Sequence, residues 1–263
     1  MTRLRSVLPL VLALVALPRP GPAGTAGSAR AAGSPGEARA LIGRVLAAYG
    51  GRPALAAVTA YRAEGDLFSL RRHESAPVTR LFARPDRLKV LIEYEGAPEA
   101  RIVDGAKGWR SSPGGELEPA SGPMLDAMVL QAARAGVPWI LAERESVARA
   151  IPPLERGGRR LPGIEIPLGG GLLVRAYVDP VTFRVEVSQG FLEHAGMRTF
   201  FETDGSDFRQ VQGIWFAFRE ENWASGVQTG FTTLRQVILN PALRPGEFAP
   251  PPPSHPAPRG RSS

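Results

Sequence analysis

Apolar and polar residues alternate along much of the chain. In the segment VQGIWFAFREENW, residues 211–223, Ile214, Phe216 and Phe218 fall on one face of an extended chain, while Trp215 falls on the other. This period of two predicts a half-buried β-strand. Similar alternation, or a short apolar run, predicts further strands at 61–67, 78–83, 88–94, 101–103, 109–111, 163–168, 172–178, 183–187, 197–203, 208–211 and 229–239.

Short turn signals separate these segments. Asp-Gly pairs at 104–105 and 204–205 are typical of hairpin turns. The triple glycine at 169–171 and the Asp-Pro pair at 179–180 also favour turns. Connections this short join strands that run in opposite directions. We therefore expect a meander of antiparallel strands.

Near the start, the apolar period becomes that of a helix. In SPGEARALIGRVLAAYGG, residues 34–51, Ser34 can cap a helix and Glu37 can bond back to it. The glycine pair at the end of this segment is typical of a helix terminus. A shorter helical turn is expected at 53–58.

Two further helices are expected in the middle of the chain, at 123–135 and 138–150. Glycine and proline residues separate and bound them, Ala is frequent in both, and the first contains Met124 and Met128. They can belong to the plain core. They can also form a lid over a binding site, because methionine suits adaptable surfaces.

Together these elements predict an α+β fold. About ten antiparallel strands form one large sheet, with helices gathered at the start and in the middle of the chain. A sheet of so many twisted strands should curl into a half-barrel, with the helices covering its concave face. No internal boundary is visible, so we expect a single domain over 34–248.

A concave face wider than its helical cover would leave an apolar pocket for a ligand. A fully packed core without a cavity explains the alternation equally well, because a half-buried strand needs an apolar face in either case. The expected ligand-binding residues share strand faces or lie on the middle helices. They are Leu88, Val90, Ile92, Met128, Trp139, Val174, Val178, Ile214, Phe216 and Phe218.

The two ends of the chain differ from the rest. Two arginines precede an apolar run at 7–17, and the small residues at 29–31 offer a cleavage site, which predicts a cleaved signal peptide over 1–31. An uncleaved membrane anchor is the alternative, although the run is about half of the roughly 20 residues that span a bilayer. The Pro-rich segment 249–263 is expected to be a disordered tail.

The charge and the cysteine count exclude some functions. The net charge is +7, but the first 31 residues contain four arginines and no acidic residue, and without them 28 basic and 25 acidic residues remain. Such a balance does not argue for nucleic-acid binding. The chain has no cysteine, which excludes disulfides and thiolate chemistry.

The sequence contains none of the G-x-S-x-G, H-E-x-x-H and G-K-[ST] motifs. His73, His194 and His255 fall in expected turns or in the tail, without a second metal ligand nearby. We expect no catalytic residue, no metal site and no cofactor, and hence no enzyme. The carboxylate pairs are expected on the solvated surface; they are Glu143 with Glu145, Glu220 with Glu221, and Asp204 with Asp207.

Six segments follow one another in a particular order: AYGGRPALAAVTAYRAEGDLF, RPDRLKVLIEY, IVDGAKGW, VDPVTFRVEV, DFRQVQGIWFAF and TLRQVILNPALRPGEFAPP. In this order they resemble the outer-membrane lipoprotein-sorting protein (LolA-like) family and its wider superfamily of exported lipid-binding half-barrels. The resemblance covers 36–250. It implies a curved antiparallel sheet with helices over its hollow, a periplasmic location, and a lipid or an acylated lipoprotein as partner. A membrane-embedded donor or acceptor protein is a further partner that it suggests.

The resemblance also implies a role for Arg84, which precedes a proline ahead of a long strand. In the family's carriers, an arginine at this place hydrogen-bonds the helical lid in the closed state; an ordinary arginine at a strand start is the alternative. The chain departs from the pattern at Ala217, where relatives often carry proline, in the hairpin at 70–82, and in its Pro-rich tail. We therefore expect a divergent carrier or binding protein for a hydrophobic ligand. The alternative is a non-catalytic sensor or protein-interaction module that uses the same fold.

Overall fold

A computed structural model describes residues 34–112 and 115–250. Thirteen strands form one sheet, and every described pairing is antiparallel, as the meander predicted, although the strand count is thirteen rather than about ten. The strands are β1 Ala60–Ser69, β2 Glu74–Ala83, β3 Arg87–Ile92, β4 Glu99–Asp104, β5 Lys107–Ser111, β6 Leu117–Pro119, β7 Arg149–Arg156, β8 Arg159–Gly169, β9 Leu172–Val178, β10 Val185–His194, β11 Met197–Val211, β12 Ile214–Ala224 and β13 Val227–Leu239.

The signal peptide expected at 1–31 and nearly all of the tail expected at 249–263 lie outside the described residues. Within the described ranges, none of the helices combines the length and the apolar character that a membrane crossing requires.

The strands follow the order β6-β5-β4-β3-β2-β1-β13-β12-β11-β10-β9-β8-β7 across the sheet. Two meanders, β1 to β6 and β7 to β13, therefore meet where β1 pairs with β13. In this central pairing Tyr61 lies opposite Leu239, and Phe68 lies opposite Phe231. The segment that connects the two meanders contains the middle helices.

The helices begin and end within about two residues of the positions that the sequence signals predict, with one exception. At the start of α1 the Glu37 amide donates to Ser34 Oγ at 3.2 Å, and the Ser34 amide donates to Glu37 Oε2 at 2.8 Å, which completes the expected capping box. Gly50, with φ of 90°, separates α1 from α2. The helices are α1 Pro35–Ala48, α2 Gly51–Ala57, α3 Gly122–Ala135 and α4 Trp139–Glu143, followed by the 3₁₀ turn η1 Glu145–Val147.

The helix expected at 138–150 is wrong in its second half. The α-helix ends at Glu143, and the chain becomes extended at Ala148 before β7 begins. Pro152 and Pro153, which suggested the end of a helix, lie instead at a register shift in β7. A strand at the edge of a sheet tolerates prolines, because one of its sides needs no hydrogen-bond donors.

The turn expected at 204–205 is also wrong. Asp204 and Gly205 lie inside β11, opposite Glu221 and Glu220 of β12. The two strands expected at 197–203 and 208–211 are therefore one strand of 15 residues. Two strands were not predicted. β7 lies partly within the segment that was expected to be a helix, and β6 is only three residues long, too short for a clear alternating pattern.

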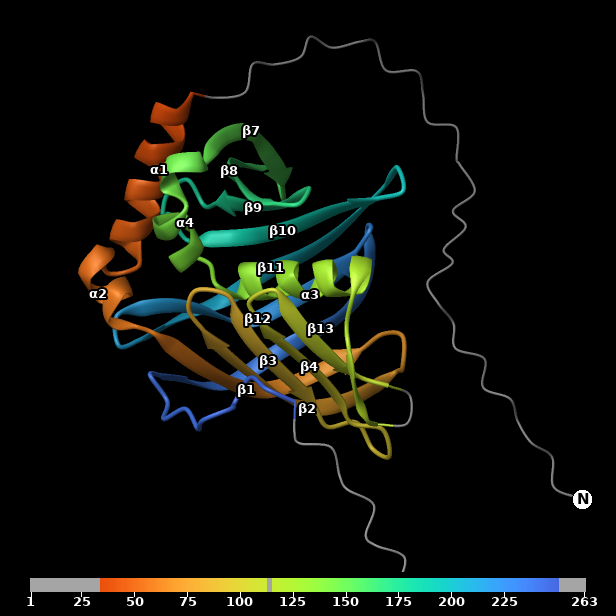
Figure 1. Ribbon diagram of the computed structural model, residues 1–263. Helices are drawn as coiled ribbons and strands as arrows, with labels where there is room; N and C mark the ends of the chain where they lie inside the picture. The colour runs from red at the N-terminus through yellow and green to blue at the C-terminus, as the bar shows by residue number, and fades with distance from the viewer. Residues whose placement is uncertain (1–33, 113–114, 251–263) are drawn as a thin grey trace, which may run out of the picture. The chain divides into compact units, whose positions relative to one another are not determined.

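The sheet curls around α3. This helix contacts β3, β4 and β5 on one side and β9 and β10 on the other. In the strand order β4 stands third and β10 tenth, seven spacings apart, which is about 34 Å in a flat sheet with strands about 4.8 Å apart. An α-helix is only about 10 Å wide, so the sheet must bend to bring both sides to α3 (Figure 1). Gly190 on β10 allows close approach, since a Cβ there would lie 3.1 Å from Leu130 Cβ.

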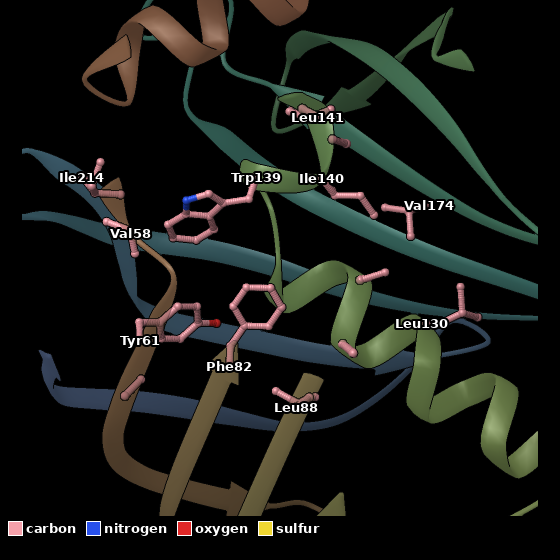
Figure 2. Packing of buried hydrophobic residues seen from close by; sticks show 14 of the residues in the cluster. Val58, Tyr61, Phe82, Leu88, Leu130, Trp139, Ile140, Leu141, Val174 and Ile214 are labelled. Carbon is pink, nitrogen blue, oxygen red and sulfur yellow. The ribbon is translucent and has the colours of Figure 1, made fainter. Parts of the chain in front are cut away.

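The main apolar core lies between the concave face of the sheet and the helices. Figure 2 shows the rings of Tyr61, Phe82 and Trp139 gathered at its centre. The ring centroids of Tyr61 and Phe82 are 5.4 Å apart, and those of Tyr61 and Trp139 are 5.9 Å apart. Leu130 and Leu141 bring α3 and α4 into the same cluster. Aromatic pairs at these distances add to the stabilisation from burial alone.

The opposite face of the sheet carries two smaller apolar clusters. Leu81 and Ala83 flank Phe82 in β2, so their side chains point away from the main core. There they pack with Phe248, which follows β13 in the chain. A second small cluster of Leu161, Tyr177 and Val187 lies on β8, β9 and β10. The sheet is thus covered in part on both faces.

Gly65 tests the central pairing of β1 with β13. A Cβ at this position would lie 2.2 Å from the carbonyl oxygen of Thr233, next to a register shift. Gly65→Ala should lower the free energy of unfolding by about 1–3 kcal/mol, because the clash is with backbone that cannot rotate away. Urea unfolding followed by circular dichroism measures the change.

The matched control is Gly43→Ala on the exposed face of α1, where nothing lies within 4 Å of the added Cβ. It should raise the free energy of unfolding by about 0.5–1 kcal/mol, since alanine favours a helix over glycine. Equal effects of the two substitutions would contradict the described register.

Candidate functional site

The ten residues expected to bind a ligand lie in one apolar cluster. Nine of them are buried, and Phe216 is half-buried against the same cluster. The structure thus brings β3, β9 and β12 together with α3 and α4 around a shared core. These side chains pack against one another, and their role in ligand binding stays a prediction.

A cavity of about 130 Å³ lies at the C-terminal end of α3. Phe216 is the only one of the ten expected ligand-binding residues that lines it. Sites that enclose drug-sized ligands have volumes of about 300–1,000 Å³, so this cavity accommodates only a small chemical group. Its other walls include Tyr49, Tyr61, Ala63, Arg80, Gln131, Arg134, Ala135, Val137, Val185, Glu186, Ser188, Thr203, Gly205, Phe208, Trp215, Ala217, Glu220, Asn222 and Leu234.

An ion pair between Arg80 and Glu220 forms one wall of the cavity. Arg80 Nη1 donates to Glu220 Oε1 at 2.8 Å, and Nη2 donates to Oε2 at 2.6 Å. Burial disfavours both charges, but their mutual attraction is larger. It holds the pKa of Glu220 below and that of Arg80 above the ordinary values. The expectation that Glu220 lies on the solvated surface is wrong, because β12 points this side chain into the hollow.

Arg134, in the last turn of α3, forms another wall. Its Nη1 donates to Thr203 Oγ1 at 2.7 Å, and Thr203 Oγ1 donates in turn to Asn222 Oδ1 at 3.0 Å. Its Nε is shielded from solvent and has no hydrogen-bond acceptor within the described part of the chain. Burial lowers the pKa of Arg134 to about 10. The Tyr61 hydroxyl donates to the carbonyl oxygen of Ala135 at 3.0 Å, and burial raises the pKa of Tyr61 to about 12.

Polar contacts at a few points hold the middle helices against the rest of the molecule. Trp139 Nε1 donates to the carbonyl oxygen of Leu55 at 2.9 Å, a buried bond that ties α4 to α2. On the surface, Arg52 Nη2 donates to Glu145 Oε2 at 2.5 Å. We call α3, α4 and η1 together the helical cover.

Arg84 lies between the ends of α2 and α4. Its Nε donates to Glu143 Oε1 at 2.7 Å, and its Nη1 donates to the carbonyl oxygens of Leu55 at 3.5 Å and Val58 at 3.3 Å. One guanidinium, placed between β2 and β3, thus contacts both the helical cover and the C-terminal end of α2. The latch role expected for Arg84 stays a prediction.

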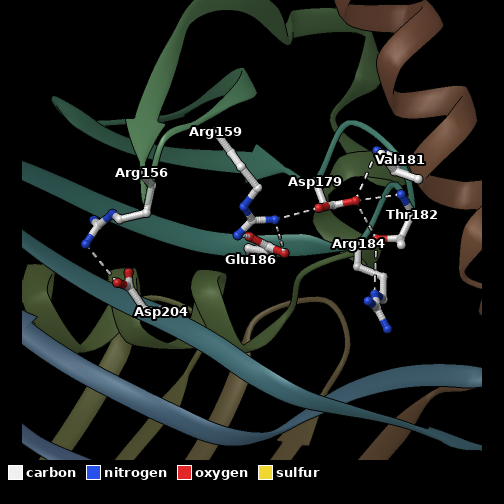
Figure 3. Close-up of polar contacts among 8 residues, drawn as sticks. All are labelled: Arg156, Arg159, Asp179, Val181, Thr182, Arg184, Glu186 and Asp204. Carbon is white, nitrogen blue, oxygen red and sulfur yellow. Dashed lines mark hydrogen bonds and ion pairs between the residues drawn. The ribbon is translucent and has the colours of Figure 1, made fainter.

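A second polar cluster joins β7, β8, β10 and β11 (Figure 3). Asp179, in the turn before β10, accepts hydrogen bonds from the Thr182 amide at 2.6 Å and from Arg159 Nη1 at 2.7 Å. Arg159 also contacts Glu186 at 2.7 Å. Arg156 Nη1 lies 2.9 Å from Asp204 Oδ2.

Asp204 is the least satisfied member of this cluster. Its Oδ1 is buried and has no hydrogen-bond partner within the described ranges. Burial raises the pKa of Asp204 to about 6, and the neighbouring carboxylates of Glu202, Glu221 and Glu186 add to the increase, while Arg156 opposes it. The expectation of a solvated Asp204 is therefore wrong. The sequence gives no signal for this cluster, because its members come from four different strands.

No group of three potential metal ligands occurs within 34–112 and 115–250. His73 and His194 are exposed, and His255 lies outside the described residues. A second cavity, of about 490 Å³, lies on the opposite face of the sheet. It is bounded by β1, β2, β3 and residues 241–247, and Lys89 Nζ donates there to Glu247 Oε1 at 2.9 Å.

No protein-family model matches the chain, and no curated protein matches its sequence. Solved structures match its fold. An outer membrane lipoprotein-sorting protein domain from Vibrio parahaemolyticus is 12% identical, with a TM-score of 0.53, and the match covers 82% of this chain and 97% of that chain. A DUF1329 family protein from Desulfovibrio piger is 11% identical, with a TM-score of 0.52 and the same two coverages.

A LolA superfamily protein from Nitrosomonas europaea is 13% identical, with a TM-score of 0.49, over 72% of this chain and 88% of that one. At such low identities the likeness of the first two structures concerns the fold alone. The chain thus has the fold of the lipoprotein-sorting domain, as the resemblance of its sequence implied.

Replacing Glu220 tests the buried ion pair. Glu220→Gln removes the negative charge beside Arg80 and should lower the free energy of unfolding by about 2–4 kcal/mol, because an unpaired buried cation remains. The control is Glu221→Gln at the next position, whose side chain is 39% exposed; it should change stability by less than about 0.5 kcal/mol. Similar losses in both variants, measured by urea unfolding, would contradict the buried pair.

Asp204 should make stability depend on pH. Its pKa of about 6 in the folded protein lies above the ordinary value of 3.8, so the folded state binds the proton more tightly. The stability that this proton adds should therefore grow as the pH falls through 6 and should be lost as the pH rises. Asp204→Asn, which mimics the protonated form, should be more stable than the natural protein at pH 8 by about 1–2 kcal/mol.

This difference should shrink at pH 5, and thermal unfolding of both proteins across pH 5–8 measures it. The exposed Asp86→Asn serves as the control and should follow the natural protein at each pH. A constant difference between Asp204→Asn and the natural protein would show that Asp204 does not titrate in this range.

Proposed function

We propose that this chain is an exported binding protein or carrier for a hydrophobic ligand, held between the concave face of the sheet and the helical cover. The ligand is a lipid or the acyl chains of a lipoprotein. One observation carries the proposal: an apolar sheet face curls around α3, and a small number of polar contacts hold the cover in place. The likeness to a lipoprotein-sorting domain supports it.

In the described conformation the cavity beside α3 has only about 130 Å³, which is too small for an acyl chain. Ligand entry therefore requires the helical cover to move. The contacts that oppose this movement include the hydrogen bonds of Trp139 and Arg84 and the apolar packing of Leu130 and Leu141. Arg84 is the latch in this proposal, because it contacts both the cover and α2.

The energies favour such an exchange. Burying an acyl chain contributes about 0.8 kcal/mol for each methylene group, or roughly 11 kcal/mol for 14 carbons before ordering costs. Each broken hydrogen bond of the cover costs about 1 kcal/mol net, and those to a charged group cost about 1.5–3 kcal/mol. The displaced apolar side chains of the cover can pack against the ligand instead.

The location and the partners belong to the same proposal. We place the protein in the periplasm, with a lipid or an acylated lipoprotein as cargo and a membrane-embedded protein as donor or acceptor. Transfer of this kind requires no catalytic residue, metal or cofactor.

A second function is favoured by the filled core. All ten expected ligand-binding residues pack against one another, and a sensor or protein-interaction module needs no hollow. This alternative predicts that the chain binds no hydrophobic probe under any condition.

Binding of N-phenyl-1-naphthylamine, an uncharged probe that fluoresces in apolar surroundings, tests the proposal. The purified chain should bind it saturably, and mass spectrometry of solvent extracts should find co-purified lipid. Arg84→Gln should increase the rate of probe uptake by roughly 3- to 30-fold, because it removes hydrogen bonds to the helical cover.

The matched control is Arg71→Gln in the exposed turn between β1 and β2, which should leave the rate unchanged. If the chain binds no probe and no lipid is extracted from it, the proposal is overturned in favour of the interaction module. If Arg84→Gln takes up the probe as fast as the natural protein does, Arg84 does not act as a latch.

A further inference from the structure

The cavity beside α3 contains a cation without a carboxylate partner. Arg134 lines it, and within the described residues no carboxylate oxygen lies within 4.0 Å of its guanidinium nitrogens. Of its five N–H groups, one donates to Thr203 Oγ1 at 2.7 Å, while Nε is shielded from solvent and donates to no acceptor in the described part of the chain. A guanidinium in such surroundings has unused capacity for two parallel hydrogen bonds.

The carboxylates that line the cavity are already paired. Glu220 accepts two hydrogen bonds from Arg80 at 2.8 and 2.6 Å. Glu186 accepts two from Arg159 at 3.1 and 2.7 Å. Each of these carboxylates thus already has an arginine as its hydrogen-bonded partner, and neither forms an ion pair with Arg134.

The position of Arg134 in the last turn of α3 explains only part of this arrangement. A cation there is favoured by the partial negative charge at the C-terminus of the helix. That attraction does not require the side chain to reach across to Thr203 on β11, where Nε becomes shielded. Burial lowers the pKa of Arg134 to about 10, so the folded protein holds this charge at a cost.

We propose that this cavity binds the carboxylate head group of an amphiphilic ligand, with Arg134 as its charge partner. The inference rests on the proposed function, since the hydrocarbon chain of the ligand would extend from the cavity into the apolar hollow beside Phe216. The ligand class is then a long-chain carboxylate, such as a free fatty acid.

The size and the charge of the cavity favour a carboxylate over a phosphate. A volume of about 130 Å³ holds a small planar group together with a few waters. A carboxylate presents two oxygens in the geometry that a guanidinium matches. A phosphate monoester carries a charge of about −1.5 to −2 at neutral pH, and Glu220 in the same cavity would repel it more strongly.

The test measures displacement of N-phenyl-1-naphthylamine at pH 8 by two ligands of equal chain length, dodecanoate and the neutral dodecanamide. The natural protein should bind dodecanoate about 10- to 100-fold more tightly than dodecanamide, as expected for a charge-assisted pair. Dodecyl phosphate should bind more weakly than dodecanoate. Equal affinity for dodecanoate and dodecanamide, or tighter binding of the phosphate, would overturn the proposal.

Arg134→Gln should abolish the preference for dodecanoate and leave the affinity for dodecanamide within about 2-fold. Arg134→Lys, which keeps the charge, should retain part of the preference. The matched control is Arg144→Gln, an exposed arginine directly after α4, which should behave as the natural protein does.

Stability provides a second readout that a merely structural arginine would not give. Because Arg134 forms no ion pair within the described residues and its Nε is shielded, Arg134→Gln should raise or maintain the urea midpoint of unfolding. A large fall in the midpoint, with the preference for dodecanoate unchanged in Arg134→Lys and Arg134→Gln alike, would assign Arg134 to the fold alone.

The outcomes separate the two proposals. A protein that binds neither the probe nor either dodecyl ligand contradicts the proposed function itself. If the protein binds the probe, dodecanoate and dodecanamide but does not distinguish dodecanoate from dodecanamide, the proposed function stands and the head-group site is contradicted.

Discussion

The contact of α3 with both halves of the sheet is the interaction on which the rest of the structure depends. A flat sheet of thirteen strands would leave β4 and β10 far apart, and in the curled sheet both contact α3 as a shared partner. Leu130, at the middle of that contact, is fully buried and lies close to Gly190. The hollow and the cavity at the end of α3 both depend on this packing arrangement. For the same reason, any movement of α3 must change the space beneath it.

Local signals in the sequence predicted local structure well. The capping box at Ser34 and the alternation in β12 depend on neighbouring residues, so they could be read without the fold. The strand at 149–156 could not be predicted in this way. Its prolines are compatible with a strand only at the edge of a sheet, and the sequence does not show which strand is outermost. The resemblance to the LolA-like family identified the fold correctly, since the order of segments reflects topology.

The polar groups of the candidate site were hidden from sequence analysis for a related reason. Glu220 and Glu221 look alike as neighbours in a charged segment, yet successive residues of a strand face opposite sides of the sheet. One of them is buried against Arg80, a partner 140 positions away, and the other has a side chain that is 39% exposed. Pairings over such distances in the chain are defined by strand register alone. The apolar residues of the hollow were easier to predict, because burial requires only the right period and not a specific partner.

The two outermost strands have a consequence for how the molecule behaves in a crowded compartment. Among the described strands, β6 and β7 end the sheet, so each exposes backbone groups that could recruit a foreign strand. β6 has only three residues and ends in Pro119, while Pro152 and Pro153 interrupt β7. Prolines offer no amide proton, and a short strand offers little length for pairing. The edges of this open half-barrel are therefore poor sites for pairing with another strand. A closed barrel avoids such pairing in a different way, because it has no free edge.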